Sequence, residues 1–209
     1  MLRILIADDH SVVRKGLRQI LTEEFLAAHI VEVADADDLF NRVLKDEWDI
    51  VITDISMPGR SGLEVLQQIR QHYPKLPILV LSVHPEDQYA IRVMRAGASG
   101  YLNKESASEE LVKAVHRVLL GKKYITPELA EKLAETLDQD AERQPHEQLS
   151  DREFEVMRQL AAGVSVSEIA EGLSLSPTTV STYRSRILNK MGVKTNADLT
   201  RYVMENKLL

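Results

Sequence analysis

Four short apolar runs, each followed at once by a polar side chain, constrain the fold of this chain more than any other feature. Stretches with helical periodicity separate the runs, and this alternation indicates a parallel sheet covered by helices on both faces. The runs are Leu2–Ala7, Asp49–Thr53, Pro77–Leu81 and Ser99–Leu102. The polar residues at or just past their ends are Asp8, Asp9, Asp54, Ser82 and Lys104. Because ligands of such sheets bind outside the carboxyl ends of the strands, these side chains predict one site at one edge.

The residue types at this edge predict a metal ion and a phosphoryl group. Three carboxylates held together, Asp8, Asp9 and Asp54, repel one another unless a cation lies between them. Mg²⁺ suits an all-oxygen pocket, and a carboxylate is a competent phosphoryl acceptor. Lys104 and Ser82 supply an ammonium and a hydroxyl that bind phosphate oxygens. Each residue alone is more often a helix cap, a turn former or a solvated charge. Their convergence favours metal-assisted phosphoryl transfer onto Asp54.

Length and composition predict two domains and a linker. A chain of 209 residues suffices for two cores, and the lack of cysteine excludes disulfides and thiolate metal sites. Strand and helix signals alternate over residues 1–122. Residues 123–148 combine a helical stretch, Pro127–Leu137, with an acidic linker, Asp138–Gln148. Residues 149–209 carry helix signals alone. Neither a signal peptide nor a membrane-spanning run is present, so a cytoplasmic protein with no membrane partner is expected.

The C-terminal region predicts four helices that include a helix–turn–helix. Its predicted helix caps are Ser150 and Ser165, each with a glutamate three residues on, Ser176 before Pro177, and Asn196. The helix–turn–helix is predicted to run from Glu168–Leu173 through a turn to Pro177–Met191. Its predicted core consists of Ile169, Ala170, Leu173, Leu175, Val180, Ile187 and Leu188.

The charge of the C-terminal region favours a nucleic-acid partner. Residues 176–209 hold six basic and two acidic side chains, although the whole chain carries a net charge of −6. Such a local excess is typical of a surface that contacts phosphates, but a basic helix is as often merely solvated. The predicted DNA contacts are Thr178, Ser181, Thr182 and Ser185 for base edges and Arg184, Arg186 and Lys190 for phosphates.

The N-terminal region resembles the receiver domains of two-component response regulators. The resemblance lies in Ile6–His10, Thr53–Pro58 and Tyr101–Lys104, together with Gly62 and Ala96–Ala98, and it covers residues 1–121. It implies a doubly wound, flavodoxin-like sheet of five parallel strands. It also implies that Asp54 is the phosphoacceptor, and that Mg²⁺ is bound by Asp54 with Asp8, Asp9 and the backbone carbonyl of Ser56.

The same resemblance implies a switch and a phosphodonor. Ser82 would be the switch hydroxyl, Lys104 the lysine typical of the family, and Tyr101 the aromatic residue that rotates inward on activation. Ser82 can move toward the phosphoryl group, which adds about −1.5 to −2 charges, and so vacate space that Tyr101 fills. A half-buried tyrosine with its hydroxyl in water is the ordinary alternative for Tyr101. A sensor histidine kinase is the expected donor.

The C-terminal region resembles LuxR-type DNA-binding domains. The resemblance lies in Leu149–Glu153, Ala162–Gly163, Glu168–Ala170, Leu175–Val180 and Lys190–Val193. Together with the receiver, the chain resembles the NarL/FixJ subfamily of response regulators from end to end. This implies a transcription regulator that binds double-stranded DNA as a homodimer, with RNA polymerase left open as a further partner. Ser181 replaces the subfamily's typical basic residue, so the base preference stays open.

Two other classes of function compete with a transcription regulator. Phosphatases of the haloacid-dehalogenase type also use an aspartyl nucleophile, but they have a second aspartate two residues on, where this chain has Ser56. A phosphorylation-controlled protein-interaction module leaves the basic helices unexplained. We therefore expect no enzymatic activity other than the phosphorylation and slow dephosphorylation of Asp54 itself. Whether phosphorylation relieves inhibition or promotes dimerisation is left open.

Overall fold

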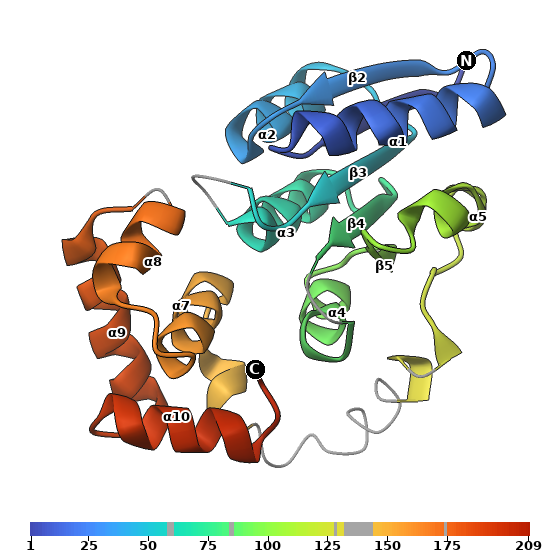
Figure 1. The fold of residues 1–209 in the computed structure, drawn as a ribbon. Helices are drawn as coiled ribbons and strands as arrows, with labels where there is room; N and C mark the ends of the chain where they lie inside the picture. Colours follow the sequence, from blue (N-terminus) through green and yellow to red (C-terminus); the bar gives the residue numbers. More distant parts are fainter. Residues whose placement is uncertain (58–60, 84–85, 128, 132–143, 174) are drawn as a thin grey trace. The chain divides into compact units, whose positions relative to one another are not determined.

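The computed structural model describes residues 1–57, 61–83, 86–127, 129–131, 144–173 and 175–209 (Figure 1). The chain divides into two compact units, Met1–Glu135 and Thr136–Leu209, which are described separately. Among the described residues, no helix combines the length and the apolar character needed to cross a membrane.

The N-terminal unit is built on a five-stranded sheet, as the receiver resemblance implied. Its strands are β1 (Arg3–Ala7), β2 (His29–Val33), β3 (Ile50–Asp54), β4 (Ile78–Ser82) and β5 (Gly100–Asn103). All neighbouring strands are parallel, in the order β2-β1-β3-β4-β5. Ala7 lies beside Thr53, and Ser82 beside Asn103. The carboxyl ends of these strands therefore meet at one edge.

Five helices cover this sheet (Figure 1). They are α1 (Ser11–Glu24), α2 (Ala36–Lys45), α3 (Gly62–His72), α4 (Glu86–Arg95) and α5 (Ala107–Leu119). Leu21 of α1 and Leu111 of α5 pack with Ile6 and Ile52 in one apolar cluster. Every residue of β3 and β4 is buried, as expected for central strands of a parallel sheet with both faces covered.

The four predicted runs coincide with β1, β3, β4 and β5; the first ends with β1 at Ala7, and the other three end one residue before their strands do. Asp54 and Ser82 are the last residues of β3 and β4, because their backbones still pair with Leu81 and Asn103. The four predicted runs did not include β2. This edge strand pairs on one side only and contains two partly exposed residues and one exposed residue, so it carries no continuous apolar signal.

A short segment after α5 extends the sheet. Tyr124 bridges to Gly100 in β5; its N–H donates to the Ser99 carbonyl (2.9 Å), and its carbonyl accepts from the Tyr101 N–H (3.2 Å). A Cβ atom at Gly100 would lie 2.8 Å from the Cβ of Tyr124, so the close approach of the two backbones requires glycine. Residues just beyond the predicted end of the N-terminal domain are thus hydrogen-bonded to its last strand.

The C-terminal unit is helical, as predicted. A short 3₁₀ helix, η1 (Pro145–Gln148), precedes α7 (Asp151–Ala161), α8 (Val166–Gly172), α9 (Pro177–Met191) and α10 (Asn196–Glu205). Residues 138–143 of the predicted acidic linker and residues 132–137 of the predicted helix Pro127–Leu137 lie outside the described residues.

Three of the four predicted helix caps are confirmed. Ser150 and Ser165 form complete capping boxes, and the Ser176 hydroxyl accepts from the Thr179 N–H. The prediction for Asn196 was wrong by one residue. Thr195 is the N-cap, because its hydroxyl and the Asp198 carboxylate each accept from the backbone N–H of the other residue. The Asn196 side chain instead accepts a hydrogen bond from Arg184.

Most of the predicted helix–turn–helix core is buried. Ile169, Val180 and Ile187 are fully inaccessible to solvent. Leu175 and Leu188 are only partly buried and lie at the margin of the core. The core of the helix–turn–helix therefore contains fewer fully buried side chains than predicted.

Candidate functional site

The predicted site exists at the carboxyl edge of the N-terminal sheet. Asp8 follows β1 and Asp54 ends β3, and their residues are only 1% and 3% exposed. Asp9 is partly exposed, and His10 is the N-cap residue of α1. Donor atoms of Asp8, Asp9, His10 and Asp54 all lie within 4.8 Å of one another. Strand pairing thus brings together carboxylates that are far apart in the sequence.

Lys104 places a cation between the two buried carboxylates. Its Nζ atom lies 2.6 Å from Asp54 Oδ2 and 2.6 Å from Asp8 Oδ2. Burial would lower the pKa of Lys104, but its hydrogen bonds to Asp54 and Asp8 outweigh burial and raise it. The Lys104 N–H donates to the Ser82 carbonyl (2.9 Å), which fixes the start of the loop beyond β5. Lys104 is therefore charged and held at the cluster.

The carboxylates retain capacity for a hard cation. The nearest partners of two carboxylate oxygens are side-chain nitrogens: Lys104 Nζ lies 2.6 Å from Asp8 Oδ2, and His10 Nδ1 lies 2.7 Å from Asp9 Oδ1. One ammonium only partly neutralises three carboxylates, so the donor set fits a divalent cation with oxygen ligands. Sequence reasoning missed His10 as a member of this set. Its position directly after Asp9 was the available signal.

The loop after β3 is held close to the site. The Ser56 N–H donates to Asp54 Oδ1 (2.9 Å). This hydrogen bond holds the backbone of Ser56 next to the Asp54 carboxylate. Gly62 packs against this loop so tightly that an added Cβ would lie 2.6 Å from Ile55 Cα. Glycine at this position therefore permits the backbone path that places Ser56 beside Asp54.

The two predicted switch residues are both buried. Ser82 is completely inaccessible to solvent at the end of β4. Tyr101, in the neighbouring strand β5, is only 2% exposed, so its ring occupies the interior and not the half-exposed position considered as the alternative. The structure therefore presents Tyr101 in the inward arrangement.

The predicted recognition helix α9 displays a polar surface. Thr178, Ser181, Thr182, Ser185 and Arg186 are all exposed. The hydroxyls of Thr182 and Ser185 donate to the carbonyls of Thr178 and Ser181, which leaves oxygen lone pairs facing outward (3.0 and 3.1 Å). This is a surface that can approach a polar groove.

Two of the predicted phosphate contacts have intramolecular partners. Arg184 is partly buried, and its Nε donates to Asn196 Oδ1 (2.7 Å). Lys190 Nζ lies 2.6 Å from Glu153 Oε2 and is thereby committed to α7. Arg186 and Lys190 are both exposed members of the predicted basic set, and Arg184 is only partly exposed.

Comparison with known proteins connects both units to one family. The family model described as response regulator receiver domain matches residues 4–116, and the model of bacterial regulatory proteins of the luxR family matches residues 147–203. Response regulator UvrY of Escherichia coli K12 is 35% identical over 210 residues, which cover 100% of this chain and 96% of UvrY. The chain belongs to the NarL/FixJ family of two-component response regulators.

Other relatives of this response regulator support the same architecture. Oxygen regulatory protein NreC of Staphylococcus carnosus is 34% identical, with 100% of this chain and 99% of NreC covered. RcsB of Salmonella enterica serovar Typhimurium, solved bound to promoter rprA with the phosphomimetic BeF₃⁻, gives a TM-score of 0.61 at 30% identity and covers 98% of this chain and 99% of its own. The chain thus has a receiver domain and a LuxR-type DNA-binding domain, as predicted.

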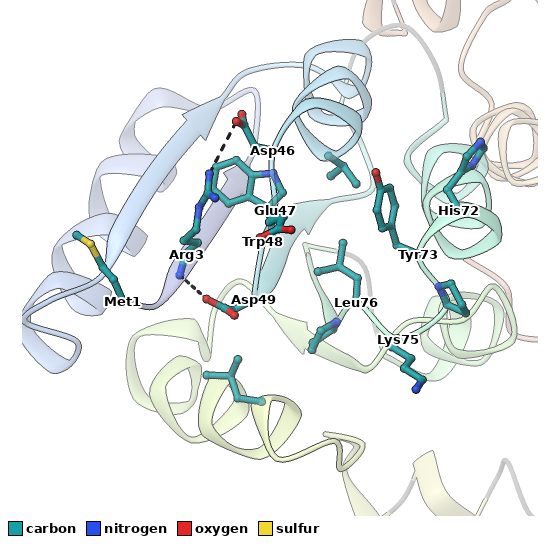
Figure 2. Close-up of a pocket in the computed structure, with 14 residues that line it drawn as sticks. Met1, Arg3, Asp46, Glu47, Trp48, Asp49, His72, Tyr73, Lys75 and Leu76 are labelled. Carbon is teal, nitrogen blue, oxygen red and sulfur yellow. Dashed lines mark hydrogen bonds and ion pairs between the residues drawn. The ribbon is translucent and has the colours of Figure 1, made fainter.

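A cavity of about 890 Å³ lies at the opposite end of the receiver sheet (Figure 2). Its wall includes Arg3, Asp49 and Pro77, at the amino ends of β1, β3 and β4. The Arg3 guanidinium lies over the Trp48 ring and pairs with Asp46 (Figure 2). The backbone N–H of Arg3 donates to Asp49 Oδ2 (2.7 Å). None of the predicted site residues lines this cavity, which is distinct from the acidic cluster.

Proposed function

We propose that Asp54 accepts a phosphoryl group and that its phosphorylation controls DNA binding by α9. The observation that carries this proposal is the position of Lys104, 2.6 Å from both Asp54 and Asp8 in a cluster of three carboxylates. An ammonium held there can pair with a phosphoryl oxygen once an oxygen of Asp54 is bonded to phosphorus in an acyl phosphate. The receiver family supports this reading of the site.

Asp8, Asp9, Asp54 and the backbone carbonyl of Ser56 would hold Mg²⁺. When bound, Mg²⁺ neutralises negative charge on the carboxylates and on the incoming phosphoryl oxygens. Asp8 lies buried behind the cluster while Asp9 reaches solvent, so the site is open on the side from which a phosphodonor approaches. The gathering of three carboxylates around a single ammonium supports this assignment.

The transfer uses groups of the chain itself. A carboxylate oxygen of Asp54 attacks phosphorus, the bond from phosphorus to the donor breaks, and the donor leaves with the bonding electron pair. Lys104 then pairs with one phosphoryl oxygen, and the Ser82 hydroxyl, at the end of the adjacent strand, donates to another. Phosphorylation and slow hydrolysis at Asp54 are the only reactions that we assign to this protein.

The phosphodonor is a sensor histidine kinase, with a small acyl phosphate as a substitute. Phosphorylated Asp54 attracts Ser82, and the ring of Tyr101, which is already buried, fills the space that Ser82 vacates. Ser82 ends β4 beside Asn103, and Tyr101 lies two residues before Asn103 in the neighbouring strand β5, so a local change at Asp54 would alter the surface formed by β5 and its helices.

The partner of the C-terminal domain is double-stranded DNA. The RcsB structures described as DNA complexes support this, as does the exposed polar face of α9 with Arg186 at its edge. A structure described as two RcsB dimers on two parallel DNAs supports a homodimer on paired half-sites. RNA polymerase is a further partner of such a regulator. The site of action is the cytoplasm, where a kinase domain and chromosomal DNA are both accessible.

Phosphoryl uptake from radiolabelled acetyl phosphate with Mg²⁺ tests the assignment of Asp54. Wild type should gain label that is labile to base, as an acyl phosphate is, and Asp54→Asn should gain none. Asp38→Asn is the matched control, because Asp38 is a half-exposed aspartate of α2 that pairs with Arg42 (3.8 Å) and is not a member of the acidic cluster. Unchanged incorporation in Asp54→Asn would exclude Asp54 as the acceptor.

A further inference from the structure

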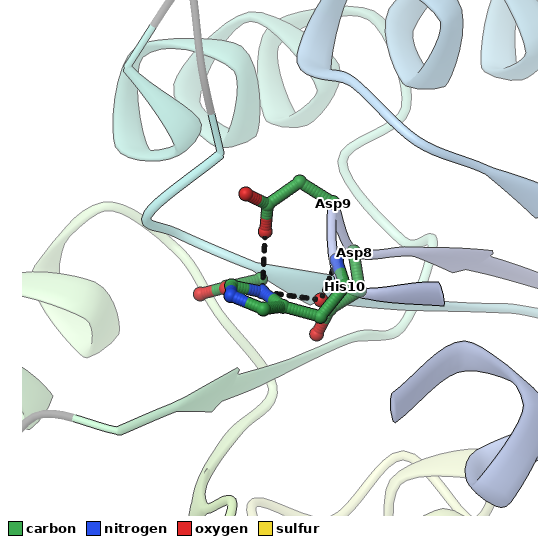
Figure 3. Close-up of side chains that lie close together, drawn as sticks. Asp8, Asp9 and His10 are labelled. Carbon is green, nitrogen blue, oxygen red and sulfur yellow. Dashed lines mark hydrogen bonds and ion pairs between the residues drawn. The ribbon is translucent and has the colours of Figure 1, made fainter. Parts of the chain in front are cut away.

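His10 contacts both carboxylates that follow β1 (Figure 3). Its Nδ1 atom lies 2.7 Å from Asp9 Oδ1 and 3.3 Å from Asp8 Oδ1, and its backbone N–H donates to the same Asp8 oxygen (2.8 Å). Figure 3 shows the imidazole ring beside the carboxylates of Asp8 and Asp9. The Nδ1 atom is therefore part of the donor cluster, although the assigned magnesium ligands are all oxygens.

The opposite ring nitrogen is able to support ligation through Nδ1. A neutral imidazole ligates through the nitrogen that carries no proton, so Nδ1 can ligate only when the proton is on Nε2. The side chain of His10 is 66% exposed, which allows Nε2–H to donate to water. Ligation therefore leaves no buried polar group without a partner.

A nitrogen donor changes which ions a carboxylate site prefers. Mg²⁺ favours oxygen ligands, whereas Co²⁺, Ni²⁺ and Zn²⁺ bind imidazole well and follow the Irving–Williams order. Lys104 brings a single positive charge to the three carboxylates of the cluster, so the donor set still has room for a divalent cation.

We propose that His10 is a metal-specificity residue of this site, which ligates Co²⁺, Ni²⁺ or Zn²⁺ through Nδ1 and leaves Mg²⁺ to the oxygens. The inference rests on the metal site of the proposed function. It assigns this response regulator a site that takes two classes of divalent ion through two overlapping ligand sets. Lys104 approaches Asp8 Oδ2, whereas His10 approaches Asp8 Oδ1 and Asp9 Oδ1, so the two side chains contact different oxygens.

The test compares Co²⁺ and Mg²⁺ binding to the full chain at about pH 8, where free imidazole is unprotonated. Isothermal titration gives each affinity, and the visible absorption of Co²⁺ reports whether nitrogen is a ligand. The variants are His10→Ala and His10→Asn; asparagine is a good N-cap and keeps the start of α1 intact. The control is His116→Ala, because His116 is also exposed and also pairs with a carboxylate, Glu24 (3.0 Å).

The proposal predicts a selective loss. Both His10 variants should bind Co²⁺ roughly tenfold or more weakly, which is at least the effect of removing an outer-shell partner. The absorption spectrum of bound Co²⁺ should also lose the bands that indicate a nitrogen ligand. Their Mg²⁺ affinity should stay within about twofold, and His116→Ala should match wild type in both. Equal losses for Co²⁺ and Mg²⁺ would mean that His10 only orients the carboxylates, and unchanged Co²⁺ binding would remove it from the site; either result overturns the proposal.

The same titrations separate this proposal from the proposed function. Mg²⁺ binding that is lost in Asp54→Asn supports the oxygen site, whatever His10 does. Failure of wild type to bind Mg²⁺ would instead contradict the site itself. A thermal melt of each His10 variant, expected to match wild type, verifies that the fold is retained.

Discussion

Lys190 of α9 and Glu153 of α7 form an ion pair with a nitrogen–oxygen distance of 2.6 Å. Glu153 is nearly buried, with a side chain 4% exposed, while the Lys190 side chain is 40% exposed. The same glutamate also closes the capping box with Ser150, so one carboxylate fixes the start of α7 and ties it to the recognition helix. A lysine expected from its sequence position to contact DNA therefore has a structural partner.

The two halves of this pair are predicted to differ in their effect on stability. Lys190→Met leaves Glu153 buried without its cation and should lower the free energy of unfolding by about 2 kcal/mol, below the 3–5 kcal/mol for fully buried pairs because Lys190 is partly exposed. Glu153→Gln keeps a capping-box side chain and lets Lys190 reach water, so it should cost only about 1 kcal/mol. Urea unfolding followed by helical circular dichroism measures both, and equal costs would contradict the asymmetry.

The same pair predicts a pH dependence. Burial would raise the pKa of Glu153, but hydrogen bonds from Lys190 and from the Ser150 backbone outweigh burial and hold it below its usual range. A carboxylate with a lowered folded-state pKa contributes stability above its unfolded pKa, about 4.3, and loses it as the pH falls through the folded value. The stability difference between wild type and Glu153→Gln should thus be constant from about pH 7 to 5 and shrink below about pH 4. A difference that persists in acid would exclude this origin.

Lys104→Met is predicted to strengthen metal binding while it weakens the phosphorylated state. Without the ammonium, Asp8 and Asp54 have only the metal to neutralise them, so Mg²⁺ affinity should rise by about tenfold, or ~1.4 kcal/mol, well within the effect of one nearby charge. Phosphoryl uptake should fall, because no cation of the chain then pairs with the phosphoryl group. Titration calorimetry and label uptake measure the two effects, and a fall in Mg²⁺ affinity would show that Lys104 organises the carboxylates instead.

Gly62→Ala is predicted to disturb the site through the backbone of its loop. The new Cβ would lie 2.6 Å from Ile55 Cα, so the segment carrying the Ser56 carbonyl must shift, at a cost of about 1–3 kcal/mol in stability and a loss of Mg²⁺ affinity. Gly16→Ala is the matched control, because nothing lies within 4 Å of a Cβ there and a helical alanine should stabilise by up to about 1 kcal/mol. Unchanged Mg²⁺ affinity in Gly62→Ala would show that the Ser56 loop takes no part in metal binding.

Two residues of α9 are predicted to affect DNA binding in different ways. Arg186→Ala should weaken binding similarly on all sequences and lower the salt-dependence slope by roughly 1, as expected for one phosphate contact. Ser181→Ala should leave the slope unchanged and alter the preference among operator sequences. Binding to several duplexes at several salt concentrations measures both; a changed slope in Ser181→Ala would reverse the two assignments.

Much of the receiver domain was predictable because it depends on short-range signals. A buried parallel strand is an apolar run, and a polar residue at its end identifies the edge where sites form, as Asp54 and Ser82 illustrate. Edge strand β2 escaped this reasoning because only part of it is buried. The inclusion of His10 depends on the turn after β1, where the Asp8 carboxylate accepts from the His10 N–H, and no periodicity encodes this.

In the C-terminal domain the caps were more predictable than the roles of charged residues. A hydroxyl cap bonds a backbone N–H three residues on, so the local sequence was enough to predict the N-caps Ser150 and Ser165. It was not enough to show that Thr195, and not the next residue Asn196, is the N-cap of α10. The charge on Lys190 is the same whether it meets a phosphate or Glu153. Only the packing of α7 against α9, between residues far apart in sequence, decides between these partners.

The most direct test of the central claim measures DNA binding at one fixed salt concentration, with and without beryllium fluoride and Mg²⁺, for wild type and Asp54→Asn. The duplex is selected from random sequences with the full chain, and the salt is held constant because it alone shifts such affinities by orders of magnitude. The account predicts tighter binding with beryllium fluoride in wild type and no change in Asp54→Asn. Identical binding in all four conditions would show that the acidic site does not control the DNA-binding domain.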